Sequence, residues 1–243
     1  MPGRIPVTNV DHPLDEKIPF RPAMVNIYCD FVAFWIRPLG FLLRNFGRKS
    51  FPFVKEFIKS MGETYAFAAE VYSKNLSTTK RPFYIKNTRF LIIHSFDPHL
   101  MCIPSLHVMV VIRTYTLFRE ILKALKAEES FAAQKEELRA GAIAITEAVL
   151  YVKQHSVNCI SAAMYAMTRF APELFPKEEA EKFAYDLFNA NTKANEKQKP
   201  GKEDSSEIQN YIISLYQQFL NQGDGNDEWT KPLLDFLKVS LSS

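Results

Sequence analysis

Residues that could bind and transfer a phosphoryl group occur in three short segments of this 243-residue sequence. Ser105 and His107 precede a long apolar-periodic run, which predicts that Ser105 is a helix N-cap whose hydroxyl oxygen accepts a hydrogen bond from a first-turn amide. His107 would then lie beside backbone N–H groups that favour anions, and its imidazole can transfer a proton. The pattern suggests a phosphate site, although an ordinary capped helix would carry the same residues.

Two cations precede this segment. Lys74 is followed after six residues by Arg81 and Pro82, within a polar, basic stretch that spans residues 73–88. An ammonium and a planar guanidinium that converge on one point would neutralise phosphate oxygens and hold them by a fork of hydrogen bonds. The alternative for such a run of charges is a solvent-exposed basic loop.

A second histidine follows an apolar helix. His155 comes directly after Lys153 and Gln154, and on a continuing helix it would share a face with Cys159, four residues further along. A histidine in this position is either a functional group or a hydrogen-bonded core residue, and the local pattern alone leaves both interpretations open.

These side chains must be positioned by helices. The chain is 47% hydrophobic, with twenty phenylalanines and eight glycines, and its apolar residues recur at three- and four-residue spacing. We therefore expect an all-α helical bundle. The predicted helices span residues 22–46 (broken near Pro38 and Gly40), 51–72, 105–126, 128–154, 161–170, 177–189, 208–220 and 229–241.

The same pattern predicts three regions. Residues 1–22 read as an extended, proline-punctuated N-terminal arm, and residues 23–176 as the helical core. Residues 177–243 read as C-terminal helices that include a polar linker at 190–206.

Charge and cysteine content restrict the partners and cofactors that can be expected. The formal net charge is +3 without an Arg-Lys block, so nucleic acid is not expected as a partner. The cysteines are three and far apart, which predicts neither a disulfide framework nor a zinc site. No cofactor or metal is expected, since the remaining candidate ligands lack metal spacing: His94, Asp97 and His99.

A membrane contact needs separate consideration. The run from Ala23 to Leu43 is strongly apolar, but Asp30, Arg37 and Pro38 interrupt it, and a charge near the centre of a spanning helix costs about 2.5–3.5 kcal/mol. We expect a buried helix of a soluble domain, with a helix lying on a membrane surface as the alternative. The first 22 residues lack the apolar core of a signal peptide. The expected location is therefore the cytoplasm or the inner face of a membrane.

Taken together in chain order, the three segments resemble a known superfamily. Lys74-x6-Arg81-Pro82, Pro104-Ser105-Leu106-His107 and Lys153-Gln154-His155 resemble the motifs of type-2 phosphatidic acid phosphatases, bacterial nonspecific acid phosphatases and vanadium haloperoxidases. The amino-acid sequences of the last two segments are similar to those of a branch that includes inositol-phosphoceramide-synthase-like proteins. The resemblance covers about residues 50–170 and implies the helical-bundle core of that superfamily.

The resemblance also implies roles for the residues. His155 would be the nucleophile that forms a phosphohistidine, and His107 the acid that protonates the leaving alkoxide. Lys74, Arg81 and Ser105 would bind the phosphoryl oxygens. The implied function is a metal-independent phosphatase or phosphotransferase that acts on a lipid phosphate or another amphiphilic phosphate. A vanadate-dependent peroxidase, which uses the same pocket, is a further alternative.

The third segment departs from the superfamily pattern. The positions of the usual arginine and aspartate fall on Val149 and Cys159. Candidate supporting residues are Lys153, which could replace the charge of the arginine but not its fork, and Cys159 and Asn158, which could stand near His155. The alternative function is accordingly a catalytically impaired protein that binds phosphate or a lipid headgroup on the same fold.

Overall fold

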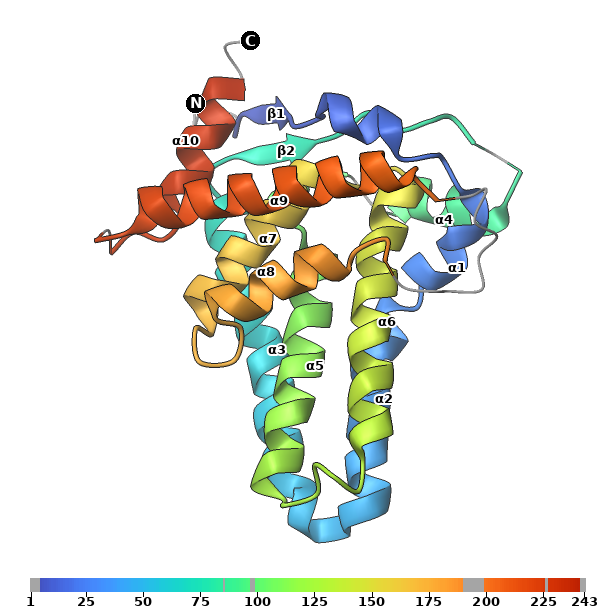
Figure 1. The fold of residues 1–243 in the computed structure, drawn as a ribbon, viewed down its shortest axis with the longest axis vertical. Coiled ribbons are helices and arrows are strands. Elements are labelled where there is room, and N and C mark those ends of the chain that lie inside the picture. Colours follow the sequence, from blue (N-terminus) through green and yellow to red (C-terminus); the bar gives the residue numbers. More distant parts are fainter. Residues whose placement is uncertain (1–4, 85, 97–98, 190–198, 226, 241–243) are drawn as a thin grey trace.

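The expected apolar stripes form the helices of an all-α bundle with little strand. The computed structural model describes residues 5–84, 86–96, 99–189, 199–225 and 227–240. The elements (Figure 1) are, in order, β1 (Val7–Asn9), α1 (Val25–Tyr28), α2 (Phe31–Phe46), α3 (Phe51–Tyr72), β2 (Leu76–Thr78), α4 (Thr88–Phe96), α5 (Leu106–Ala124), α6 (Ala132–Tyr151), α7 (Val157–Phe170), α8 (Lys177–Asp186), α9 (Lys202–Gly223) and α10 (Lys231–Ser240).

Four long helices form a stem. Helices α2, α3, α5 and α6 run antiparallel to their sequence neighbours, with α2 and α3 behind α6 and α5 in the view of Figure 1. A short 3-10 helix, Gly47–Ser50, turns the chain between α2 and α3 at the tip of the stem. Buried Leu42, Phe57 and Leu117 come from three of these helices and belong to one apolar cluster. Burial of these faces holds the stem together.

The remaining elements form a head across one end of the stem. Helix α7 packs against α9, and α8 and α10 also pack on α9. Strands β1 and β2 pair in parallel, with Val7 opposite Leu76. Thus part of the predicted extended arm is a strand, and a 3-10 helix follows it at Pro13–Lys17. Val10, Leu14 and Ile18 of the arm are buried, so the arm is part of the core.

Helix α2 corrects one prediction. It runs without a break through Pro38, and the chain is interrupted earlier, between Tyr28 and Phe31. Phe34, Pro38 and Leu42 are buried along one face of α2. This burial outweighs the single hydrogen bond that a proline cannot donate.

Several predicted boundaries also differ from the structure. Helix α7 starts four residues before the predicted residue 161, since Ser156 caps it. Helix α9 starts at Lys202, so residues 202–206 are helical and not linker. Residues 190–198 of the predicted linker lie outside the described residues, as do Asp97 and the side chain of His94.

Candidate functional site

The two histidines meet where the head joins the stem. Helix α5 begins at Leu106, so His107 lies in its first turn as predicted. His155 follows the end of α6, and its Nε2 atom lies 3.4 Å from Nδ1 of His107. The ring centroids are 5.5 Å apart, and the ring planes are inclined by 67°. Residues 48 positions apart in the sequence thus form one imidazole pair.

The polar tripeptide after α6 places His155. Lys153 has a left-handed φ of 57°, and its N–H donates to Leu150 O at 3.0 Å while Gln154 N–H donates to Val149 O at 3.0 Å. These two bonds form a Schellman motif, which ends a helix and reverses the chain. The reversal brings His155 back toward the start of α5.

Aromatic rings surround His107. The ring of Tyr28 lies 4.7 Å from the imidazole centroid, and that of Phe31 lies 4.3 Å from it. Burial, and then the charge of His155, lower the pKa of His107 to about 3. His107 is therefore neutral near pH 7 in the protein without a bound anion.

Ser105 is the N-cap of α5, as predicted, but its side chain makes no capping bond. Its Oγ atom has no hydrogen-bond partner among the described residues, although the residue is fully buried. Its backbone N–H donates to Cys159 O at 3.4 Å, which ties the start of α5 to α7. The start of α5 therefore offers a buried hydroxyl with unused hydrogen-bonding capacity.

At the start of α7, in contrast, side chains accept hydrogen bonds from the first-turn amides. Ser156 Oγ accepts from Asn158 N at 3.3 Å, and Asp15 Oδ1 accepts from Val157 N at 2.9 Å. Burial raises the pKa of Asp15, although its hydrogen bonds with Ser156, His12 and Val157 oppose the shift. The carboxylate of Asp15 thus occupies the anion position at this helix start. Sequence reasoning missed Asp15, because 142 residues separate it from Val157 and no local pattern links them.

Two buried cysteines, Cys102 and Cys159, lie near His155. Cys159 Sγ accepts from Ser156 N at 3.4 Å, and burial raises the pKa of Cys159. The pKa of Cys102 is lowered by its interactions with Cys159, His155 and His99. His155 Nδ1 is buried and has no hydrogen-bond partner among the described residues. Within the described residues, no carboxylate therefore accepts from this atom to orient the imidazole, and the thiol of Cys102 is the neighbouring group that interacts with His155.

Two of the candidate supporting residues bind the arm. Asn158 Nδ2 donates to Val10 O at 3.1 Å, and its Oδ1 accepts from Tyr211 OH at 2.6 Å. Lys153 Nζ donates to the carbonyl oxygens of Asp15 and Ile18. Both side chains hold the N-terminal arm against the head. Neither of these contacts reaches His155.

The two predicted cations lie in different surroundings. Lys74 Nζ donates to Glu228 Oε1 at 2.7 Å and to Thr230 Oγ1 at 3.3 Å. Arg81 instead lines a cavity of about 710 Å³ between the arm and the loop after β2. Lys74 is not among the described residues that line this cavity. Its role as a phosphate ligand stays a prediction, which requires the ion pair with Glu228 to open.

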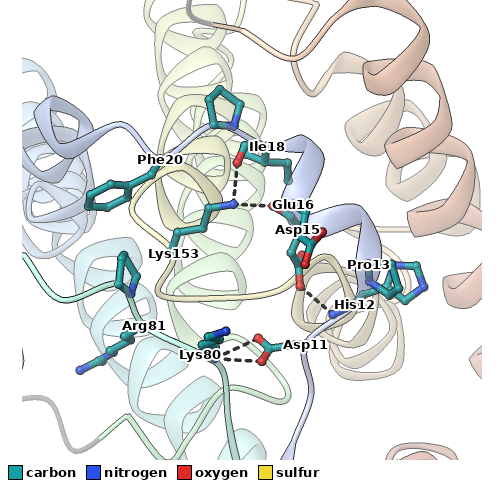
Figure 2. A pocket seen from close by; sticks show the side chains of 12 residues that line it. Asp11, His12, Pro13, Asp15, Glu16, Ile18, Phe20, Lys80, Arg81 and Lys153 are labelled. Atoms are coloured by element: carbon teal, nitrogen blue, oxygen red, sulfur yellow. Dashed lines mark hydrogen bonds between the residues drawn. The ribbon is translucent and has the colours of Figure 1, made fainter.

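Figure 2 shows this cavity. Lys153 reaches across it to the arm, and the guanidinium of Arg81 points away from Asp11. Lys80 N donates to Asp11 Oδ1 at 3.0 Å, which closes one side. Phe20 gives the cavity an apolar wall. His107 and His155 are not among its lining residues, so the cavity and the imidazole pair are separate sites. Lys153 lines the cavity and lies two residues before His155, so the two sites are close along the chain.

In comparisons with known proteins, no family model, curated protein or solved structure matches this chain. The superfamily resemblance therefore stays a prediction based on the three motifs. Within the described residues, no three His, Cys, Asp or Glu side chains are grouped so that they could hold a metal ion.

Proposed function

We propose that this protein is a metal-independent phosphatase or phosphotransferase that forms a phosphohistidine on His155 and acts on an amphiphilic phosphate ester. The observation that carries the proposal is the 3.4 Å contact between the imidazoles of His155 and His107. This pair lies at a helix start whose buried Ser105 hydroxyl has no partner among the described residues. A nucleophile, a proton donor and an anion-binding helix start are thus combined in one place.

The proposed chemistry proceeds in two steps. Nε2 of His155 attacks phosphorus, the bond from phosphorus to the ester oxygen breaks, and His107 gives its proton to the leaving alkoxide. Water, or another alcohol, then attacks the phosphohistidine while His107 accepts a proton, and the phosphoryl group leaves His155. The Ser105 hydroxyl and the first-turn amides of α5 would donate to the equatorial oxygens.

Substrate binding must change the imidazole pair. Ring nitrogens 3.4 Å apart are at hydrogen-bond distance and leave no room for phosphorus between them. The ring of His107 therefore has to turn within the slot formed by Tyr28 and Phe31. A bound phosphate dianion would then favour the imidazolium form of His107, which supplies the proton for the leaving group.

The test is phosphate release from p-nitrophenyl phosphate and from a short-chain phosphatidic acid, in the presence of EDTA. We expect turnover that His155→Gln abolishes and that Ser105→Ala lowers by about tenfold or more. Ser130, an exposed serine in the turn between α5 and α6, provides the matched control, and Ser130→Ala should leave the rate unchanged. Trapping of an acid-labile phosphoryl group on the wild type, but not on His155→Gln, identifies the nucleophile. Turnover that survives His155→Gln contradicts the proposal.

The second candidate is a non-catalytic phosphate or lipid-headgroup binder. It is favoured by the absence of an acceptor for His155 Nδ1 among the described residues and by the bonding of Lys74 to Glu228. Losing the group that orients a catalytic histidine costs about 10⁴ in rate in serine proteases. Saturable phosphate binding that His155→Gln weakens, with no turnover of either ester, would identify the protein as this binder.

A further inference from the structure

Helix α2 carries an apolar stripe on its outer side. Val32, Ile36, Leu39 and Leu43 follow one another at intervals of four, three and four residues, so they share one face of the helix. Val32 is 47% exposed and Ile36 is 48% exposed. The opposite face buries Phe34 and Pro38 inside the bundle. The helix is therefore apolar on two sides, although only one of them packs in the core of the bundle.

Helix α3 carries a second stripe beside the first. Phe51, Ile58 and Tyr65 recur every seven residues and are 56%, 51% and 42% exposed. Half-buried Trp35 of α2 and Val54 of α3 both pack against one cluster of buried residues, so the two stripes border the same seam. We call the joined stripes the α2–α3 outer face, which consists of Val32, Ile36, Leu39, Leu43, Phe51, Ile58 and Tyr65. A contiguous apolar surface of this kind marks a contact site.

The charges of this face are basic at the tip of the stem, whereas further along α3 exposed Glu56 and Glu63 flank Lys59 and pair with it. From residue 31 to residue 55 the sequence has no Asp or Glu, but it contains five basic residues: Arg37, Arg44, Arg48, Lys49 and Lys55. Arg37 is paired with Asp30, with Nη1 2.8 Å from Oδ1. Arg44, Arg48, Lys49 and Lys55 are exposed at or near the tip of the stem. A basic cluster at one end of an apolar stripe complements an anionic lipid surface.

We propose that the α2–α3 outer face docks the protein onto the surface of an anionic lipid bilayer, with the stem lying along the headgroup layer. The stripe would enter the acyl boundary while the basic residues contact lipid phosphates. By length and composition, part of the stretch Pro22–Tyr72 is apolar enough to cross a membrane, and only a third of that part is buried inside the protein. The inner faces of α2 and α3 are needed by the bundle, however, so surface docking fits the fold better than crossing does. This surface is independent of the proposed phosphohistidine chemistry.

Trp35 provides a reporter for the contact. It is half-buried on α2, whereas Trp229, the only other tryptophan, is buried and donates to Glu70. Titration with vesicles of phosphatidylglycerol and phosphatidylcholine should shift the tryptophan emission to shorter wavelength, and brominated lipid should quench it. Trp35→Phe should remove both signals while cosedimentation with the vesicles persists.

Variants separate the two parts of the contact. Val32→Ser combined with Ile36→Ser and Leu43→Ser should weaken vesicle binding by about tenfold or more, since less apolar area is buried in the bilayer. Arg48→Glu with Lys49→Glu should weaken binding to the anionic vesicles only, and about 1 M salt should have the same effect. Tyr185→Ser with Val239→Ser, exposed apolar residues of α8 and α10, is the matched control and should bind as the wild type does.

Two outcomes would overturn the proposal. One is wild-type protein that does not cosediment with anionic vesicles under low salt. The other is a dimer in sedimentation velocity that the triple serine variant dissociates while vesicle binding is unchanged, because the face would then bind a second copy of this chain. Apart from half-buried Trp35, the substituted residues are exposed, and circular dichroism checks that all variants remain folded.

Discussion

At the scale of single residues, the imidazole pair makes anion binding sensitive to pH. His107 has a pKa lowered to about 3 and is neutral near pH 7, whereas a bound dianion would favour its protonated form. Binding therefore takes up a proton. We expect the affinity for sulfate, a phosphate mimic that does not titrate in this range, to fall by up to about tenfold per pH unit above about pH 3, until the pH reaches the pKa of His107 in the complex.

Titration calorimetry in buffers of different ionisation enthalpy measures this uptake. His107→Gln should bind sulfate with an affinity that changes little with pH, because the titrating group is gone. Equal proton uptake by the wild type and His107→Gln would show that another group takes the proton.

A buried carboxyl group next to the last turn of α6 makes stability depend on pH. Glu147 is 3% exposed, its Oε1 accepts from Phe188 N at 2.6 Å, and burial raises its pKa to about 7. Between the unfolded pKa of about 4.5 and the folded value, only the folded protein keeps the proton. The free energy of unfolding therefore falls as pH rises through this window, by up to about 3 kcal/mol, and is constant above about pH 7.

Glu147→Gln tests this linkage. Glutamine keeps an oxygen acceptor for Phe188 N but carries no charge, so its unfolding free energy should equal that of the wild type near pH 5 and exceed it at pH 8. Urea unfolding at the two pH values gives the comparison. A wild type that is equally stable at both pH values would mean that Glu147 does not hold its proton in the folded state.

At the scale of elements, a glycine sets how closely α2 and α6 approach. A Cβ atom on Gly141 would lie 2.7 Å from Cε2 of Phe34, and Phe34 is itself buried. Gly141→Ala should therefore lower the unfolding free energy by about 1–3 kcal/mol through overpacking. Gly62 of α3 has no atom within 4 Å of the added Cβ, so Gly62→Ala should raise it by about 0.5–1 kcal/mol.

Thermal unfolding of the two variants separates packing from helix propensity, which favours alanine at both positions. The two melting temperatures should move in opposite directions relative to the wild type. A gain in both would indicate that α2 can shift away from α6 at little cost.

At the scale of the whole molecule, the C-terminal helices complete the core. Phe183, Tyr216 and Phe219 come from α8 and α9 and are fully buried in one cluster with Tyr165 of α7. Tyr165 OH also donates to Trp229 O at 2.9 Å. Removing these helices would expose the apolar face of α7 that they cover, and a domain with a usual net stability of only about 5–15 kcal/mol tolerates little loss of burial.

A chain that ends at residue 176 should therefore lack a cooperative urea transition, although sequence pattern places its boundary at the end of the helical core. Full-length protein should unfold in one transition followed by both circular dichroism and fluorescence. A folded, monomeric 1–176 chain with a sharp transition would show instead that the C-terminal helices form a separate unit.

By itself, the sequence determined the all-α class, most of the helices and the chemistry that its polar residues could support. These features depend on neighbours in the chain: apolar spacing defines a helix face, and Ser105 marks a helix start. The sequence prediction places the start of α7 at residue 161 and misses its cap, Ser156. Local pattern could not show that the hydroxyl of Ser156 caps its helix while that of Ser105 does not.

Only the tertiary structure decided which distant groups meet. It joined His107 to His155 and placed the carboxylate of Asp15 at the start of α7. It also turned Lys74 toward Glu228, which is 154 residues away, and left Arg81 at the cavity. Such contacts depend on the path of every intervening helix and on the burial of whole faces. No local spacing in the chain records them.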